Sequence, residues 1–322
     1  MPMMKAVRAH ERGGPEVLVY EEAPVPAPGP GEVLVRVHAV GITFAELTWD
    51  ETWTRDGEPR TPTIPGHEVA GRVVEVGDGV DTVVVGDPVF GLVPFDRDGG
   101  AAEYAVLPQD WVALRPLEVD PVHAAALPLA ALTALQALVD HGGVHEGSRV
   151  LVQGAAGAVG VFAVQLAKLR GAHVTAVARE QDREYLHMLG ADEVLDFTDE
   201  PIPASEGADA GYDVALFAAN GSPSDDLYAS VRPGGVLVSL NGPPDAALTE
   251  RHGIRGSFFI VSADRAQLDE LAQLARTQRL SIPIAATWAL KDARAAFESG
   301  RTHGRLPGKT VLVVEAPATS AR

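Results

Sequence analysis

Cysteine is absent from this sequence of 322 residues. Its absence excludes disulfides, thiolate metal sites and cysteine nucleophiles. Basic residues are scarce, with 26 Lys and Arg against 44 Asp and Glu, and the formal net charge is -18. A negative surface repels phosphate backbones and anionic lipid headgroups, so we expect neither a nucleic-acid partner nor a membrane partner.

Long apolar runs are also missing. No run reaches 18 residues and no charged-then-apolar leader opens the chain. We therefore expect no membrane span and no secretory signal, and we predict a cytoplasmic location. A G-x-S-x-G turn is missing as well, which argues against acyl transfer by a serine nucleophile.

The sequence divides into two regions with different patterns of residues. From Met4 to about Pro116, short Val-rich runs punctuated by Gly and Pro predict an antiparallel, barrel-like β domain. A helical stretch at 122–141 follows, and strands and helices then alternate as far as Gln278. This alternation predicts an α/β fold with a doubly wound parallel sheet. Its predicted strands are 149–153, 173–178, 193–196, 212–217, 235–240 and 255–261.

From about Ala285 the tail again has the pattern of β-strands, so we expect it to return to the first domain. The predicted division is a substrate domain at 1–122 and 280–322 and a dinucleotide-binding domain at 123–279. Two domains suit a chain of this length, because single cores stop growing near roughly 250 to 300 residues.

The strongest motif is GAAGAVG at 154–160, which lies between a strand and an amphipathic helix. Gly154 is expected to allow the sharp turn, Gly157 the approach of a pyrophosphate, and Gly160 the close packing of helix on strand. The backbone amides of Ala155, Ala156, Ala158 and Val159 complete the predicted phosphate site, with the positive end of the helix.

The choice of cofactor depends on the residues after the second strand of this unit. Arg179 and Arg183 are placed to bracket a 2′-phosphate, which favours NADPH over NADH. Glu180 lies near the spacing of the acid that binds the ribose of NAD. Its alternative role is to begin the next helix, where an acid interacts favourably with the helix dipole.

An ordered series of motifs runs through nearly the whole chain. It comprises PxPGPGEVLVRVHAVGI at 26–42, IPGHEVAGRVVEVGDGV at 64–80, VGDPVFG at 85–91, AALPLAALTALQAL at 125–138, the glycine turn, LGADEVLDF at 189–197, RPGGVLVSL at 232–240 and GKTVLVV at 308–314. In these motifs the chain resembles the medium-chain dehydrogenase/reductase superfamily, and within it the zinc-lacking quinone oxidoreductase, zeta-crystallin-like branch.

The resemblance implies a GroES-like substrate domain, a Rossmann domain inserted into it, a nicotinamide between them and a homodimer. It places Thr133 close to the nicotinamide, with Phe258 and Phe259 flanking the ring. It places Phe217, Ala218, Ala219, Asn241 and Gly242 against the adenosine or ribose. It also implies that Arg305 or Lys309 reaches the cofactor from the tail.

Zinc-using members of the superfamily place a cysteine near residue 43 and a histidine in a G-H-E segment. Here His67 and Glu68 are present without any cysteine. A site made by Glu46, His67 and Glu68 is conceivable, because zinc accepts three such ligands with water. The alternative, which we favour, is that His67 and Glu68 make hydrogen bonds that fix a loop, and we predict no metal.

Hydride transfer is the chemistry of the cofactor, so the protein need only align the reactants, exclude water and stabilise an oxyanion. Thr43 is the first candidate for polarising the substrate oxygen, followed by Tyr104 and His67. Trp49 and Trp53, with Glu46, are expected to line the acceptor side, where aromatic walls suit flat conjugated molecules. The tryptophans could equally be the packing of a lid.

The sequence therefore predicts an NADPH-dependent reductase of a quinone, enone or related carbonyl compound. One alternative is a carbonyl or enoyl-thioester reductase of a biosynthetic pathway. Another, from a different class, is a nucleotide-binding structural or sensor protein without turnover.

Overall fold

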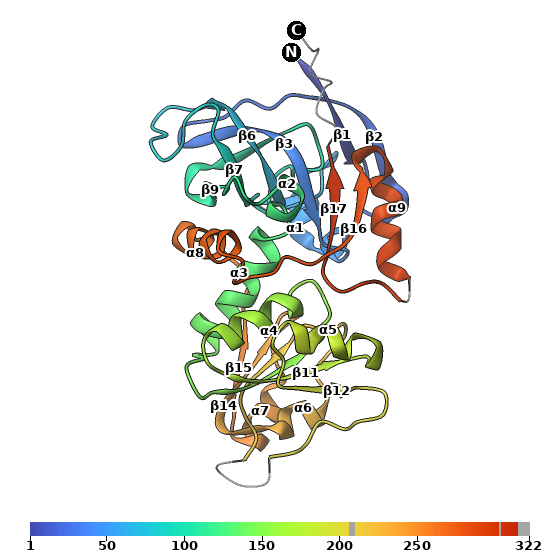
Figure 1. Ribbon diagram of the computed structural model, residues 1–322. Helices are drawn as coiled ribbons and strands as arrows, with labels where there is room; N and C mark the ends of the chain where they lie inside the picture. The colour runs from blue at the N-terminus through green and yellow to red at the C-terminus, as the bar shows by residue number, and fades with distance from the viewer. Residues whose placement is uncertain (206–209, 303, 315–322) are drawn as a thin grey trace. The chain divides into compact units, whose positions relative to one another are not determined.

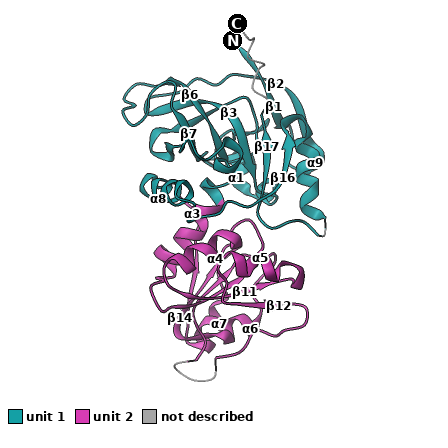
Figure 2. Ribbon diagram, viewed as in Figure 1, with its two compact units in different colours: residues 1–129, 263–322 teal, residues 130–262 magenta. Residues whose placement is uncertain are grey.

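The computed structural model describes residues 1–205, 210–302 and 304–314. The chain forms two compact units, with residues 1–129 and 263–322 in unit 1 and residues 130–262 in unit 2 (Figure 2). No helix among the described residues is both long enough and apolar enough to cross a membrane.

Unit 1 contains the barrel-like β structure. Its strands are β1 (Met3–Ala9), β2 (Leu18–Pro24), β3 (Glu32–Ile42), β4 (Thr54–Arg55), β5 (Glu58–Pro59), β6 (Glu68–Val76), β7 (Pro88–Leu92), β8 (Tyr104–Pro108), β9 (Val112–Leu114), β16 (Ile284–Ala289) and β17 (Lys309–Val313). Its helices are α1 (Asp50–Trp53), α2 (Pro121–Ala124), α8 (Arg265–Arg276) and α9 (Ala293–Glu298), and α3 (Pro128–Gln136) begins in unit 1 and continues in unit 2.

The main sheet of unit 1 has the strand order β16-β17-β3-β6-β7-β9, and β8 also pairs with β3. Strand β17 pairs antiparallel with β3, in a register that places Thr310 opposite Ile42. The predicted return of the tail to the first domain is therefore confirmed. This register matters for the site, because it brings the end of the chain beside residues near position 43.

Unit 2 is an α/β unit with one parallel sheet. Its strands are β10 (Arg149–Gln153), β11 (His173–Ala178), β12 (Glu193–Asp196), β13 (Tyr212–Phe217), β14 (Val231–Ser239) and β15 (Arg255–Phe258), and its helices are α4 (Gly160–Leu169), α5 (Arg183–Met188), α6 (Asp225–Ser230) and α7 (Ala246–His252). Helices α4 and α5 cover one face of the sheet and α6 and α7 the other (Figure 1).

The strand order in unit 2 is β12-β11-β10-β13-β14-β15. This is the order of a doubly wound dinucleotide-binding sheet, and the order reverses between β10 and β13. Such sheets bind ligands beyond the carboxyl ends of the strands at that reversal. The predicted α/β class is confirmed, with a doubly wound parallel sheet in one unit and a mainly antiparallel β structure in the other.

The observed division differs from the predicted one at both boundaries. We predicted breaks after residues 122 and 279, whereas the compact units meet at 129/130 and 262/263. The reason is packing, because α2 contacts β3 and β6, and α8 contacts β9. Both helices therefore belong to unit 1, although their sequences match the helical texture of the second domain.

Helix α7 was not predicted, although the sequence carries its end signals. Asp245 precedes it and accepts hydrogen bonds from the amides of Ala247 and Leu248, at 2.8 and 3.1 Å. Gly253 follows it in the left-handed conformation, with φ of 64°. An acidic N-cap and a glycine after the last turn are ordinary helix boundaries.

Candidate functional site

The glycine turn directly follows β10 and leads into α4. Gly154 has a φ of +84°, and a Cβ there would lie 2.7 Å from the carbonyl oxygen of Ala218. A Cβ on Gly160 would lie 2.2 Å from the carbonyl oxygen of Gly154. Only glycine fits at these two positions, the first because of its conformation and the second because the helix packs closely on the turn.

Gly157 differs from the other two glycines. It is exposed, and the only atom near an added Cβ would be the Gly154 oxygen, at 3.1 Å. The amide of Ala155, which was predicted to bind phosphate, donates instead to the Val177 carbonyl oxygen at 3.2 Å. Among the described residues, the amides of Ala156, Ala158, Val159 and Gly160 donate to no backbone acceptor. Bare amides at the start of a ten-residue helix suit an anion, so the turn fits the diphosphate of a dinucleotide.

The loops after β13 and β14 lie at the same edge of the sheet. The amide of Ala218 donates to the carbonyl oxygen of Gln153 across the strand reversal, at 2.9 Å. The Asn241 side-chain amide donates to the carbonyl oxygens of Ala219 and Gly221. The structure therefore brings Phe217, Ala218, Ala219 and Asn241 together at the carboxyl ends of the strands.

The end of β11 carries the residues that were predicted to select the cofactor. Arg179 is exposed immediately after the strand. Arg183, by contrast, donates from Nε to Glu180 at 2.7 Å, pairs with Glu200 at 3.3 Å and donates to the Val194 carbonyl oxygen. Arg183 thus has protein partners where we had predicted a phosphate. The carboxylates of Glu180 and Glu200 raise the pKa of its guanidinium.

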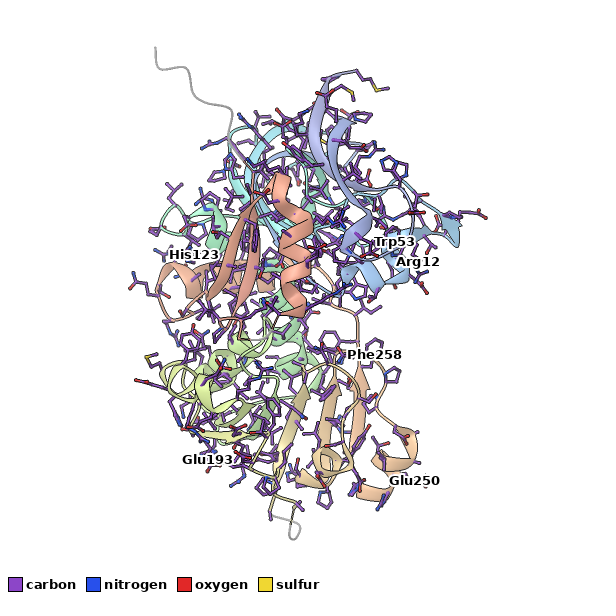
Figure 3. All side chains as sticks on the ribbon, turned by 90° about the vertical axis from the view of Figure 1, so that its right-hand side faces the viewer. Arg12, Trp53, His123, Glu193, Glu250 and Phe258 are labelled. Atoms are coloured by element: carbon purple, nitrogen blue, oxygen red, sulfur yellow. The ribbon has the colours of Figure 1, made fainter. Side chains whose placement is uncertain are left out.

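Helix α3, which carries Thr133, is joined to the segment after β15 by a side chain that was not among the predicted site residues. Gln136, three residues after Thr133, exchanges two hydrogen bonds with the backbone of Ser262, at 2.8 and 3.2 Å. The His141 ring stacks on Phe259 at 4.1 Å between centroids. Phe258 is 38% exposed on β15 (Figure 3). Phe259 is therefore held by an aromatic partner, whereas Phe258 remains accessible.

Unit 1 contains a buried polar cluster at the ends of three adjacent strands. We define it as Thr43, Glu46, His67, Glu68 and Lys309. Glu46, His67, Glu68 and Lys309 are at most 2% exposed, and Thr43 is half-buried. The carboxyl group of Glu46 accepts from the amide of Gly66 at 3.1 Å and lies 4.0 Å from Nε2 of His67.

Burial determines the protonation of two members of this cluster. It raises the pKa of the Glu46 carboxyl from 4.5 to about 8. It lowers the pKa of the His67 imidazole from 6.5 to about 4. At neutral pH both side chains are therefore uncharged, so the cluster's ionic contact is the pair that Lys309 forms with Glu68.

Lys309 departs from its predicted role. The resemblance implies that Arg305 or Lys309 reaches the cofactor, but the Lys309 ammonium is enclosed, forms an ion pair with Glu68 and donates to the Thr43 hydroxyl at 3.0 Å. Glu68 also accepts from the amide of Leu129 at 3.0 Å. We predicted that His67 and Glu68 fix a loop by hydrogen bonds, whereas this bond ties Glu68 to the start of helix α3.

The aromatic residues near His67 are only partly those that were predicted. Trp49 lies edge-on to Phe95 at 5.5 Å, and Phe95 lies 5.2 Å from the His67 ring. Trp53 is 3% exposed and belongs to the hydrophobic core of unit 1, where its Nε1 donates to the Leu47 carbonyl oxygen at 2.9 Å (Figure 3). Trp53 is therefore a core residue and Trp49 an accessible one, while Phe95 was missed.

Arg305 lies beside this region. Its guanidinium stacks on the Phe44 ring at 4.1 Å and donates to the Thr310 hydroxyl at 3.1 Å. Partial burial lowers its pKa, and no carboxylate among the described residues pairs with it. A half-buried cation without a carboxylate partner is suited to an anionic ligand.

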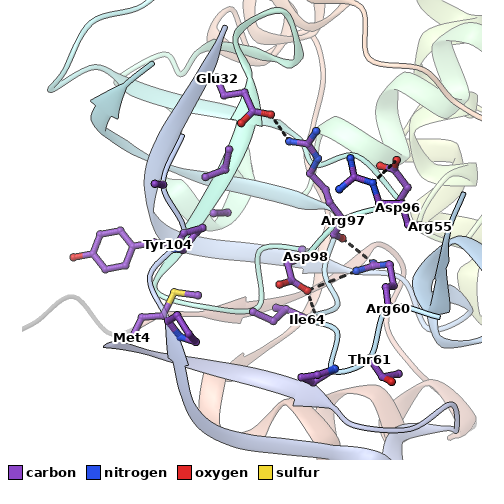
Figure 4. Close-up of a pocket in the computed structure, with 17 residues that line it drawn as sticks. Met4, Glu32, Arg55, Arg60, Thr61, Ile64, Asp96, Arg97, Asp98 and Tyr104 are labelled. Atoms are coloured by element: carbon purple, nitrogen blue, oxygen red, sulfur yellow. Dashed lines mark hydrogen bonds and ion pairs between the residues drawn. The ribbon is translucent and has the colours of Figure 1, made fainter. Parts of the chain in front are cut away.

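Tyr104 lies away from the polar cluster. It is paired with Arg36 on β3, seven residues before Thr43, which corresponds to roughly 20 Å along a strand. It lines a separate pocket of about 670 Å³ (Figure 4). That pocket contains the ion pairs Arg97–Glu32 at 2.6 Å and Arg60–Asp98 at 3.6 Å. The structure does not bring Tyr104 together with Thr43 and His67.

The residues of the cluster do not fit a zinc ion. Glu68 is occupied by Lys309 and the Leu129 amide, and the ammonium would face any cation bound there. No thiolate is available. In the described part of the chain, no group of three or more His, Asp or Glu side chains is arranged to hold a metal ion.

Comparison with known proteins identifies the family. Residues 29–117 match the alcohol dehydrogenase GroES-like domain, and residues 189–312 match the zinc-binding dehydrogenase family. The chain is 38% identical over 244 residues to the chloroplast envelope quinone oxidoreductase homolog of Arabidopsis thaliana, with 74% of each chain covered. It is 31% identical over 324 residues to the chloroplastic quinone-oxidoreductase QR1 of Triphysaria versicolor, covering 96% of this chain and 98% of that protein.

A solved structure agrees with these relatives. The quinone oxidoreductase from Coxiella burnetii superposes with a TM-score of 0.87 at 26% identity, over 98% of this chain and 100% of that one. The chain therefore belongs to the medium-chain dehydrogenase/reductase superfamily, in its quinone oxidoreductase branch, whose members are oxidoreductases that use a nicotinamide cofactor.

Proposed function

We propose that the protein is an NADPH-dependent oxidoreductase that reduces a quinone, an enone or a related conjugated carbonyl compound. Unit 2 holds the cofactor at the glycine turn, and unit 1 binds the acceptor. The observation that carries the proposal is the Thr43 hydroxyl, half-buried in a cluster whose other members are enclosed and which adjoins the rings of Trp49 and Phe95. A flat acceptor suits aromatic walls, and its oxygen needs one donor.

When bound, the reduced nicotinamide supplies a hydride to the acceptor carbon. The chain's own residues then have three tasks. The glycine turn would bind the cofactor's diphosphate, Trp49 and Phe95 would orient the acceptor and exclude water, and Thr43 would donate to the oxygen on which negative charge develops. His67, neutral and buried against Phe95, supports the wall without carrying charge.

The preference for NADPH is supported by the charges at the end of β11. Arg179 is exposed there, and the carboxylate of Glu180 is engaged by Arg183 at 2.7 Å. An engaged acid is a poorer acceptor for the ribose hydroxyls of NADH, and it repels a 2′-phosphate less. Arg183 therefore supports the preference indirectly, while Arg179 would meet the phosphate.

Replacement of Arg179 by alanine should raise the Kd for NADPH about 10- to 100-fold, because a charge-assisted hydrogen bond is lost, and should leave the Kd for NADH within about twofold. Fluorescence titration with both nucleotides measures this. Arg251→Ala is the matched control, since Arg251 is an exposed arginine of unit 2 that pairs with Asp225 at 3.4 Å. If NADPH and NADH weaken equally in Arg179→Ala, the assignment of the phosphate site is wrong.

The function itself is tested by the oxidation of NADPH with a panel of acceptors. We expect turnover with benzoquinones and with α,β-unsaturated ketones. Turnover confined to simple ketones or to enoyl thioesters would assign the protein to the alternative reductases instead. Nucleotide binding without turnover of any acceptor would indicate a sensor or structural role. The cytoplasmic location and the homodimer stay predictions, to be checked by fractionation and by light scattering.

A further inference from the structure

The strand register places Lys309 beside Thr43. Thr310 on β17 lies opposite Ile42 on β3, so Lys309 lies opposite Thr43 at the next position of this antiparallel pair. The observed contact agrees, with Lys309 Nζ 3.0 Å from Thr43 Oγ1. Lys309 and Thr43 therefore lie close together because the backbones of two segments that are far apart in the sequence pair with each other.

Gly41 on β3 allows Glu68, from the neighbouring strand β6, to reach Lys309. Glu68 on β6 lies opposite Gly41 on β3, and Gly41 shares a face of the strand with Thr43. A Cβ on Gly41 would lie 2.6 Å from the Glu68 carboxylate. The missing side chain lets this carboxylate cross β3 and reach Lys309, which holds the buried ammonium in place.

The chemistry of the two groups determines the direction of the Thr43 hydroxyl. An ammonium has three donors and no acceptor, so Thr43 Oγ1 must accept from Lys309. The hydroxyl hydrogen then points elsewhere. Among the described residues, it donates to no acceptor. Because Thr43 is half-buried whereas Lys309 is enclosed, this free O–H is the part of the cluster that a ligand can reach.

On the basis of the proposed function, we infer that Lys309 is a positioning residue that aims the Thr43 hydroxyl at the acceptor oxygen and resupplies its proton. Thr43 is then the catalytic residue, and Glu68 anchors Lys309. Neither Lys309 nor Glu68 touches the acceptor.

The proton and electron balance is as follows. Hydride addition to the acceptor carbon shifts an electron pair onto the acceptor oxygen. The Thr43 O–H bond breaks and its proton forms a bond to that oxygen. A proton from Lys309 Nζ passes to Thr43 Oγ1. After the product leaves, water that reaches the half-buried Thr43 returns a proton to the enclosed amine through Oγ1. The net reaction consumes one hydride and one proton, as reduction of an enone or a quinone requires.

The first test removes the hydroxyl. Thr43→Val should lower kcat for an enone about 100-fold, as expected for the loss of a general acid, with the KM and the Kd for NADPH within about threefold. Thr43→Ser, which keeps the donor, should stay within about fivefold of wild type. Thr48→Val is the matched control, because the Thr48 hydroxyl is also in this segment and donates only to the Ala45 carbonyl oxygen, at 2.6 Å.

A readout that a structural defect would not move is the dependence on product basicity. In a series of substituted benzoquinones and enones, the loss caused by Thr43→Val should grow as the product oxyanion becomes more basic, because a weakly basic oxyanion needs no donor. The solvent deuterium isotope effect on kcat should fall toward unity in the same variant. An equal loss across the series would show that Thr43 is only structural and would overturn the inference.

The second test concerns Lys309. Lys309→Met alone would strand the buried Glu68 charge and could prevent folding, so it is combined with Glu68→Gln. The double variant should bind NADPH normally, lose about tenfold in kcat with the same dependence on oxyanion basicity, and show no further loss when Thr43→Val is added. Independent, multiplying losses would show that Lys309 does not act through Thr43. If the wild type reduces no quinone or enone, the proposed function fails instead.

Discussion

Replacement of Gly157 by aspartate should reduce the affinity for both nucleotides at least about 100-fold while leaving unit 2 folded. Gly157 is exposed, and an added Cβ would lie 3.1 Å from a single backbone oxygen, so a side chain requires a shift of only a few tenths of an ångström in the turn. The new carboxylate would face the diphosphate, and two like charges about 4 Å apart near a protein surface repel by roughly 4 kcal/mol. Fluorescence titration with NADPH and NADH measures the loss, and circular dichroism measures the fold.

Two further variants of the turn separate charge from shape. Gly157→Ala adds the same Cβ without charge and should weaken binding much less, by about tenfold. Gly160→Ala places a Cβ 2.2 Å from the Gly154 oxygen, so it should lower the melting temperature of the free protein as well as the affinity. Near-normal binding by the Gly157→Asp protein would mean that the diphosphate does not lie on this turn.

The second large effect is the response of stability to pH at Glu46. The folded protein holds the proton of this carboxyl more tightly than the unfolded chain, since its pKa is raised from 4.5 to about 8. The stability that this group contributes is therefore complete below about pH 4.5 and is lost as the pH rises to 8. At about 1.4 kcal/mol per pH unit, the loss amounts to roughly 5 kcal/mol.

Glu46→Gln should abolish most of this slope, because the amide keeps the shape and cannot ionise. Urea unfolding at pH 5.5, 7 and 8.5 tests it. The free energy of unfolding of the variant should increase relative to that of the wild type as the pH rises. Glu75→Gln, at an exposed carboxyl on β6, should follow the wild-type curve. Parallel curves for Glu46→Gln and wild type would show that the Glu46 carboxyl is ionised in the folded state at neutral pH.

His67 gives the opposite dependence at the acid end. Its pKa is lowered from 6.5 to about 4, so the unfolded chain takes up the proton first as the pH falls. Stability should then decrease by roughly 3 kcal/mol between those two values. The same unfolding measurements, extended to pH 4, report this decrease. His67→Gln should lack it, and a decrease that persists in this variant would assign it to other groups.

Much of the fold of unit 2 could be predicted, because the sequence patterns that indicate its strands and turns are local. The predicted strands at 149–153, 173–178, 193–196 and 212–217 have the bounds of β10, β11, β12 and β13. Short apolar runs separated by turns and helices report such strands directly. The glycine spacing likewise indicated where Gly154 and Gly160 would be required, since a positive φ and a close approach exclude side chains there.

Side-chain contacts that join segments distant in the sequence, in unit 1 and also in unit 2, were predicted less well. Lys309 sits in a family motif that suggested a cofactor contact, but the pairing of β17 with β3 places it against Thr43. Trp53 lies in the same short segment as Trp49, so the sequence does not distinguish them, yet Trp53 packs into the core of unit 1. Arg183 has the spacing of a phosphate ligand, but Glu200, from beyond the next strand, holds it.

The sequence by itself determined the two-part fold, the position of the dinucleotide turn and the absence of thiolate chemistry, because periodicity, glycine spacing and composition act over short stretches of chain. Only the tertiary structure decided which of the candidate side chains are free and which are bound to one another. That depends on the register between β17, β3 and β6, and a shift by one residue would move Lys309 to the other face of the sheet, away from Thr43.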